Sequence, residues 1–374
     1  MILVVLLLTV TCHGAAFEGP DGGLSSGTEL PDTAVNWGPY ITNTTQNSTT
    51  LHWRTDQPVI GTLEYTPITP NGTFPSWIVK YEDQPTRTHS IFLRELAPGQ
   101  TYAYRIGGSN QEYSFRTYPV SGPVRFIVYG DTREQLPSYN QSTHHALVAN
   151  RIAAEPDVLF VVHTGDLVNN PDDNDEWDRF FSAAGPMLAN TTFYAVPGNH
   201  EGDLQRYQEL FGFPSWYSFM CGGAEMVMLN SNALPLEVET AQDDWLNQTL
   251  DQRPGDKFVF LHHPLYTSEV NHWGGFTNIR KAWEPVFIGA GVTVVFSAHV
   301  HTYEHYEIRG IHYFTLGTGG APFYPLSPHK PAGYVSSLEN TLAYARVTVN
   351  PTTGSTLIEV IQVGEERDNK IHLV

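Results

Sequence analysis

The distribution of apolar positions divides the chain into regions with different periodicities. From about residue 33 to 118, short runs that alternate apolar and polar side chains are separated by Pro and Gly turns, and this spacing predicts a small β-sandwich. The clearest runs are Thr49–Arg54, Gly61–Tyr65, His89–Leu93 and Tyr102–Ile106. We assign this region no chemistry, because its sequence contains no cluster of acids and histidines.

After residue 120 the apolar runs become continuous and alternate with helical stretches. Strands that are covered on both faces have this pattern, so residues 120–374 are predicted to form a layered α/β domain. The predicted strands are Val124–Tyr129, Val158–His163, Phe193–Val196, Met226–Leu229, Phe258–His262 and Val292–Ser297, with a helix near Thr143–Ala153 and further β sequence at Leu342–Val349 and Thr356–Val363.

The first 32 residues resemble neither region. Met1–Val10 is an apolar run too short to span a bilayer, and small residues follow it at Gly14–Ala16, so residues 1–16 are predicted to be a signal peptide. The run has no Lys or Arg before it, and a buried N-terminal strand is the alternative. Residues 17–32 are rich in Gly, Ser, Pro and acids, which is typical of an exposed linker.

Further features agree with a secreted protein that has no transmembrane segment. Sequons for N-glycosylation support export. They begin at Asn43, Asn47, Asn71, Asn140, Asn190 and Asn247. Once the signal peptide is removed, Cys221 is the only cysteine, so we expect no internal disulfide and a core position for this thiol.

The net charge of the chain indicates which kinds of molecule it can bind. The chain has 39 Asp and Glu against 20 Lys and Arg, a net charge of −19, which argues against a nucleic-acid scaffold because phosphate backbones are bound by Lys and Arg. A small anionic substrate is compatible with this charge, since bound dications reverse the field locally. The 16 histidines supply potential metal ligands.

Five short segments place polar residues directly after predicted strands. They are GDTR at 130–133, GDLVNN at 165–170, GNHE at 198–201, HHP at 262–264 and AHVH at 298–301. In open α/β sheets such positions gather in one crevice at the carboxyl ends of the strands. Their oxygen and nitrogen donors suit hard or borderline metals such as Fe, Zn or Mn. The candidate metal ligands are Asp131, Asp166, Asn199, His262, His299 and His301.

This ligand set predicts two cations rather than one. Asp166 is the natural bridging carboxylate, because the other five ligands would crowd a single ion. Two cations about 3.5–4 Å apart clamp the attacking and leaving oxygens of an in-line displacement. His299 and His301 would point in opposite directions along an ideal strand, so they serve separate ions only if the chain turns between them.

The five segments, in this order, resemble the metallophosphoesterase (calcineurin-like) superfamily, and most closely purple-acid-phosphatase-like proteins. LAPGQTYAY at 96–104 is also similar to the corner of a fibronectin type III module, which those proteins carry ahead of the catalytic domain. WYSF at 216–219, LNSN at 229–232 and GTGGAP at 317–322 agree as well. The resemblance implies an all-β fibronectin III-like sandwich over residues 33–119, followed by an α/β four-layer sandwich catalytic domain over residues 120–374.

The resemblance also implies a role for each site residue. One ion would be held by Asp131, Asp166 and His301, and the other by Asp166, Asn199, His262 and His299. His200 would face the phosphate, where it stabilises the transition state or protonates the leaving group. His272 would contact the substrate.

Two positions depart from the family pattern. Asn169 stands where purple enzymes have the Tyr that gives their colour, so a protein without that colour is expected. Arg133 stands where many calcineurin-like enzymes have His, and it either contacts phosphate or forms a structural salt bridge.

Other histidines receive structural interpretations. His263 is expected to be a supporting residue rather than a ligand, and His163 a buried strand residue bonded to backbone. His144 and His145 are expected at a helix N-terminus, from which one of them could approach the first ion.

The sequence thus predicts a secreted binuclear metalloenzyme that hydrolyses small phosphate monoesters with metal-activated water. Phosphodiesters and pyro- or polyphosphate are alternative substrates. A non-catalytic secreted binding protein with a degraded metal site is the competing class. No sequence feature indicates an oligomeric state.

Overall fold

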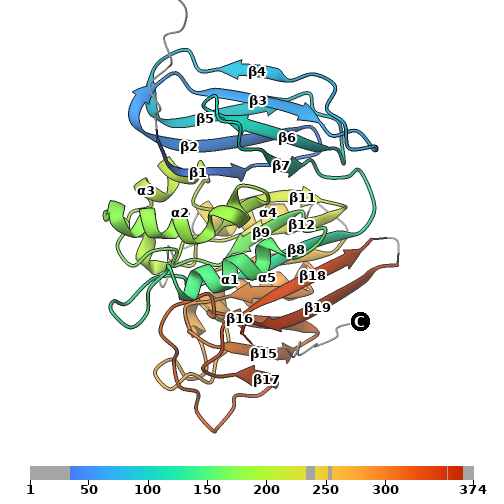
Figure 1. Cartoon of the computed structure of the whole chain (residues 1–374). Helices are drawn as coiled ribbons and strands as arrows, with labels where there is room; N and C mark the ends of the chain where they lie inside the picture. Colours follow the sequence, from blue (N-terminus) through green and yellow to red (C-terminus); the bar gives the residue numbers. More distant parts are fainter. Residues whose placement is uncertain (1–33, 233–240, 252–254, 352, 365–374) are drawn as a thin grey trace, which may run out of the picture. The chain divides into compact units, whose positions relative to one another are not determined.

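The computed structural model describes residues 34–232, 241–251, 255–351 and 353–364 (Figure 1). The predicted signal peptide and linker lie outside these residues. The described residues belong to one compact unit. Among the helices that are described, none is both long and apolar enough to cross a membrane.

The N-terminal region is an antiparallel β-sandwich, as predicted. One face consists of β1 (Val35–Thr42), β2 (Ser48–Val59) and β5 (Thr86–Arg94). The other is a sheet in the order β4-β3-β6-β7, formed by Ile78–Tyr81, Thr62–Pro67, Thr101–Ile106 and Tyr113–Arg116. Leu51 and Leu93 from the first face share one buried cluster with Leu63 and Phe115 from the second. The Tyr102 hydroxyl accepts a hydrogen bond from the Ala97 backbone N–H at 2.8 Å, the corner contact that the sequence indicated.

Strand β1 also continues into the sheet of the following region. It pairs in parallel with β10 (Thr192–Ala195), with Ile41 opposite Thr192. The resulting eight-stranded sheet has the order β19-β18-β8-β9-β10-β1-β2-β5. The Tyr104 hydroxyl adds a side-chain link by donating to the Ala189 carbonyl at 2.6 Å. The boundary between residues 119 and 120 stays a prediction.

The remaining strands form the two central sheets of the α/β region. The eight-stranded sheet takes β8 (Val124–Tyr129), β9 (Phe160–His163), β18 (Ala343–Asn350) and β19 (Ser355–Gln362). The seven-stranded sheet has the order β11-β12-β13-β14-β16-β15-β17. Its strands are Tyr217–Cys221, Ala224–Met228, Lys257–Phe260, Val294–Ser297, Ile311–Leu316, Tyr303–Ile308 and Tyr334–Leu338, in that order.

Helices cover the outer faces of both sheets. The helices are α1 (His144–Ala153), α2 (Asn174–Leu188), α3 (Gln205–Phe211), α4 (Ala241–Asp251) and α5 (Thr277–Gly289). Between the sheets, Phe126 packs against Phe160 and meets Phe258 edge-on, with ring centroids 5.5 Å apart. Helices α1 and α2 pack on the first sheet, and α4 and α5 pack on the second through Leu246 and Trp283. This order of layers confirms the predicted four-layer α/β sandwich.

The buried His52 of β2 makes stability depend on pH. Its Nε2 lies 2.8 Å from Thr42 Oγ1, and burial lowers its pKa from 6.5 to about 4. The unfolded chain therefore takes up a proton first, so the stabilisation is complete above pH 6.5 and is lost as the pH falls towards 4. The total loss is about 3 kcal/mol. We expect a His52→Gln variant to lose less stability than the native chain between pH 7 and pH 4.5 in urea unfolding. Equal losses would contradict this role for His52.

Candidate metal centre

The five polar segments meet at one edge of the two sheets. Strands β8, β9 and β10 are mutually parallel, and so are β13 and β14. Each of the five polar segments begins within three residues of the end of its strand. The sequence that follows each strand therefore carries its polar side chains to the carboxyl edge, the position at which open α/β sheets bind ligands.

The first group of potential ligands is Asp131, Asp166 and His301, all buried and with donor atoms within 4.8 Å of one another. His301 Nδ1 donates to the Pro322 carbonyl, which can only accept, so its Nε2 carries a lone pair. That Nε2 lies 3.3 Å from Asp131 Oδ1, a buried oxygen without a hydrogen-bond partner. When the ring is neutral, two acceptors face each other with no proton between them, an arrangement that a cation satisfies.

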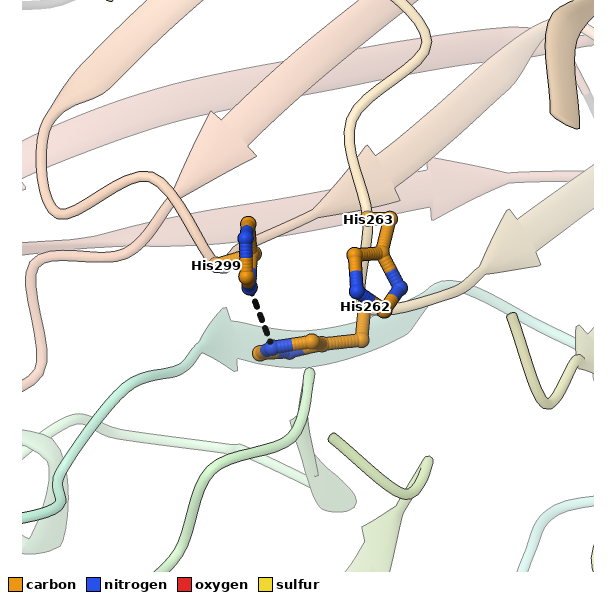
Figure 2. A group of neighbouring side chains, drawn as sticks. All are labelled: His262, His263 and His299. Atoms are coloured by element: carbon orange, nitrogen blue, oxygen red, sulfur yellow. Dashed lines mark hydrogen bonds between the residues drawn. The ribbon is translucent and has the colours of Figure 1, made fainter. Parts of the chain in front are cut away.

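The second group follows the same logic. His262 Nδ1 faces the Thr164 carbonyl at 2.8 Å and donates to it, so Nε2 is the nitrogen that faces the cluster and becomes an acceptor when the ring is neutral. Asn199 Oδ1 lies 3.1 Å from this Nε2, and His299 Nδ1 lies 3.2 Å from it (Figure 2). Metal-binding histidines commonly donate their second N–H to a backbone carbonyl, as both His262 and His301 do.

Asp166 connects the two groups. Its carboxylate belongs to the first group, and its Oδ1 lies 3.3 Å from His262 Nε2 of the second. The donors on both sides are carboxylate oxygens, an amide oxygen and imidazole nitrogens, a set suited to Fe, Zn or Mn. The residues present therefore fit two neighbouring cations that share Asp166.

The pKa values of the clustered side chains are shifted by burial and by the charges of their neighbours. Burial alone would raise the pKa of Asp166, but the charge and hydrogen bond of His262 hold it well below its usual range. Burial alone would lower the pKa of His262, whereas the Asp166 carboxylate raises it to about 9. Burial lowers the pKa of His299. A bound cation takes the place of the proton that Asp166 and His262 would otherwise share.

Local backbone geometry directs the ligands into the cluster. Asp131, Asp166 and His299 have φ values of 55°, 58° and 63°, in the left-handed region that non-glycine residues rarely adopt. The Val300 N–H bonds to the Ala298 carbonyl at 2.7 Å, so the chain turns sharply at His299. The sequence allowed His299 and His301 to serve separate ions only if the chain turns between them. The turn at His299 places His299 in one group and His301 in the other.

Two glycines permit the close approach of these loops. A Cβ on Gly165, whose φ is 97°, would lie 2.6 Å from His262 Nδ1. A Cβ on Gly198 would lie 2.2 Å from Asp166 Oδ1. Any side chain at either position would displace a candidate ligand.

Sequence reasoning missed Glu201, which joins two of the ligand loops. Its buried carboxylate accepts hydrogen bonds from the backbone N–H groups of Asp166 and Leu167, each at 2.9 Å, and of Gly198 at 2.6 Å. Burial and the neighbouring Asp166 charge raise its pKa to about 7. Its place in GNHE was visible, but a sequence does not reveal that this acid turns inwards.

His200 lies beside the cluster with one ring nitrogen free to face it. Its backbone N–H donates to Asp166 Oδ1 at 3.1 Å, and its Nδ1 faces the Asn169 carbonyl at 2.8 Å. Its Nε2 lies 3.9 Å from Asp166 Oδ2. Asn169 thus contributes its backbone carbonyl here, while its side chain is exposed.

Arg133 lies beside the first ligand group and His272 beside the second. Arg133 Nε is 3.7 Å from Asp166 Oδ2, and its guanidinium donates to the Tyr324 hydroxyl at 3.2 Å. His272 Nδ1 lies 2.7 Å from the buried Glu269 carboxylate, and its ring is 5.2 Å from that of His299.

The other singled-out residues occupy supporting positions. His163 is buried and bonds to Thr132 Oγ1 at 3.1 Å and to the Gly165 backbone N–H at 3.2 Å. His144 and His145 begin α1, and burial lowers the pKa of His145 to about 3. Cys221 is a buried free thiol, as expected.

Comparisons with known proteins agree with this architecture. Residues 124–303 match the calcineurin-like phosphoesterase family, and residues 38–117 match the purple acid phosphatase N-terminal domain. One match lies in each region of the fold. The chain belongs to the calcineurin-like metallophosphoesterases that carry a purple acid phosphatase N-terminal domain.

Within that family the chain is a homologue of purple acid phosphatases. It is 28% identical to purple acid phosphatase 22 of Arabidopsis thaliana over 70% of this chain and 66% of that protein. It is 26% identical to the Fe(3+)-Zn(2+) purple acid phosphatase 12 of the same plant, over 59% of this chain and 52% of that protein. The chain thus spans less than two thirds of the length of either relative.

A solved structure shares the fold over most of the chain. The purple acid phosphatase PPD1 from yellow lupin (Lupinus luteus) seeds matches with a TM-score of 0.75 at 18% identity. The match covers 89% of this chain and 73% of the lupin chain. It therefore includes the N-terminal sandwich as well as the four-layer region.

Proposed function

We propose that this protein is a secreted, binuclear metal-dependent phosphatase that hydrolyses small phosphate monoesters. The observation that carries the proposal is the pair of neighbouring ligand groups, in which Asp131 Oδ1 faces His301 Nε2 and Asp166 Oδ1 faces His262 Nε2, each at 3.3 Å. When bound, two cations supply Lewis acidity and lower the pKa of a coordinated water towards about 7. In this proposal one cation is held by Asp131, Asp166 and His301, and the other by Asp166, Asn199, His262 and His299.

The chain's own residues orient the substrate around this centre. Arg133 lies beside Asp166 and offers a planar set of N–H donors that suits two phosphate oxygens. His200 is fixed through Nδ1, which donates to the Asn169 carbonyl, so Nε2 is the nitrogen that faces the substrate. In its protonated form the ring donates from Nε2 to a phosphate oxygen or gives that proton to the leaving oxygen. His272 is fixed in the same way by the Glu269 carboxylate and contacts the substrate from the His299 side.

Secretion is the second part of the proposal. Apolar residues 1–10 followed by Gly14–Ala16 support a signal peptide. Five of the acceptor asparagines are exposed and Asn140 is half-buried, so they lie at positions that can carry glycans. We expect the chain expressed in eukaryotic cells to appear in the medium and to lose mass on treatment with a glycosidase. Retention inside the cell without glycans would contradict secretion.

A substrate panel on the full, metal-loaded chain tests the activity. We expect turnover of p-nitrophenyl phosphate to exceed that of its bis-ester, pyrophosphate and polyphosphate. A preference for the bis-ester or the polyphosphates would make this chain a diesterase or a polyphosphate hydrolase with the same centre. Metal binding without turnover of any of them would contradict the enzyme and favour a binding protein.

A further inference from the structure

His263 is a third imidazole at the second ligand group, next in sequence to the candidate ligand His262. Its ring centroid lies 4.5 Å from that of His299 and 5.0 Å from that of His262. One of its ring nitrogens is on the His299 side in Figure 2, and the other faces away. A donor atom of His263 lies within 4.8 Å of donor atoms of both neighbours. Proximity alone would therefore permit His263 to be a metal ligand.

The outward-facing nitrogen determines the tautomer. His263 Nδ1 lies 2.8 Å from the hydroxyl oxygen of Ser231. That oxygen already accepts the backbone N–H of His262 at 3.2 Å and the backbone N–H of His263 at 3.1 Å. A serine hydroxyl has two lone pairs and one proton, so both lone pairs are in use and only its proton remains for Nδ1. Nδ1 is therefore an acceptor, and the ring proton resides on Nε2.

Ser231 is held in place by α4. The buried Gln242 side chain accepts from the Asn230 backbone N–H at 2.8 Å and donates to the Asn230 carbonyl at 3.0 Å. The Leu229 N–H bonds to the Phe260 carbonyl at 2.9 Å, which ties the same turn to the end of β13. To accept a proton from Nδ1, the Ser231 oxygen would first have to give up one of its two backbone N–H groups. The anchored turn holds Ser231 in the position where it accepts both. Gln242 thus fixes Asn230, and the next residue, Ser231, bonds to His263.

An imidazole that carries its proton on Nε2 has no lone pair there to offer a metal. We propose that His263 is a phosphate-contacting residue whose Nε2–H donates a hydrogen bond to an anionic oxygen of the substrate, beside the cations rather than bound to one. This inference rests on the proposed phosphatase function and deepens it. His263 thus has a direct role at the substrate instead of a supporting one, and the set of candidate ligands is unchanged. Phe276, whose ring lies 4.7 Å from that of His263, helps to keep the imidazole in position.

Measurements of metal content and of phosphate affinity together show whether His263 donates a hydrogen bond to phosphate or binds a metal. We expect metal-loaded His263→Ala to keep the native metal content and to bind inorganic phosphate about tenfold more weakly in calorimetry, the loss of one charge-assisted hydrogen bond. His263→Gln places an amide N–H near the position of Nε2 and should recover part of the affinity. His312→Ala is the matched control, a half-buried histidine at the start of β16 whose loss should change neither quantity.

Ser231→Ala provides an independent variant that leaves the imidazole in place. Without the hydroxyl, Nδ1 is free to take the proton, so phosphate binding should weaken about threefold or more while metal content is unchanged. Loss of metal from His263→Ala would overturn the proposal by making His263 a ligand. Unchanged phosphate affinity in both variants would also overturn it. Failure of the native chain to bind phosphate or turn over monoesters would instead contradict the proposed function itself.

Discussion

We expect Asp166→Asn to lose its metal and to reduce turnover of p-nitrophenyl phosphate by about 10³-fold or more, which corresponds to several kcal/mol of lost stabilisation. Asp166 belongs to the first ligand group and reaches His262 of the second at 3.3 Å. The neutral amide keeps the shape of the carboxylate but removes the charge that both cations share. Elemental analysis of the purified variant, alongside initial rates, measures both effects.

Asp157→Asn is the matched control for this substitution. Asp157 is exposed, and its φ of 59° is close to the 58° of Asp166, so the same exchange is made in the same backbone conformation. Asn tolerates left-handed φ values, and we expect native metal content and rates in this control. A native metal content in Asp166→Asn would show that this carboxylate does not bridge two ions.

The second large effect is expected at His200. Removal of its imidazole in His200→Ala should lower kcat by about 10²–10³-fold, the range for loss of a positioned acid or base. The metal content should stay native, because Nε2 lies 3.9 Å from Asp166 and Nδ1 is taken by the Asn169 carbonyl. Paired measurements of kcat and metal content on one preparation test this separation.

The pattern of losses distinguishes His200 from the ligands. A substrate with a good leaving group, such as p-nitrophenol, needs less protonation than an alkyl alcohol, so the loss should be larger for alkyl phosphates if His200 acts as the acid. His312→Ala should leave both rates unchanged. A fall in metal content that parallels the fall in kcat would place His200 among the ligands.

The sequence was sufficient to predict the two regions of the fold and the positions of the candidate ligands. The continuous apolar runs became β8, β9, β10, β13 and β14, and the polar residues after them meet at one edge because parallel strands end together. The sandwich was predictable from period-2 alternation and from the Tyr102 corner. These signals are local, which is why they can be read from a single sequence.

Features that depend on long-range contacts were not predictable. The pairing of β1 with β10 brings Ile41 opposite Thr192, and no local pattern specifies that partner. The inward turn of Glu201 depends on backbone N–H groups of a distant loop, and the tautomer of His263 depends on the hydroxyl of the distant Ser231. The sequence interpretation of His263 as a supporting residue rested on its place beside a ligand, and only the hydrogen bonds of Ser231 indicate which ring nitrogen carries the proton.

The metal content of the native chain tests the two-cation centre most directly. The full protein would be freed of metal with a chelator, loaded with Fe and Zn, passed over a desalting column and analysed for metal per folded chain. We expect two ions per chain, with monoester hydrolysis that disappears on chelation and returns on reloading. A folded chain that retains one ion or none, or that hydrolyses the monoester equally well after chelation, would contradict a shared site built on Asp166.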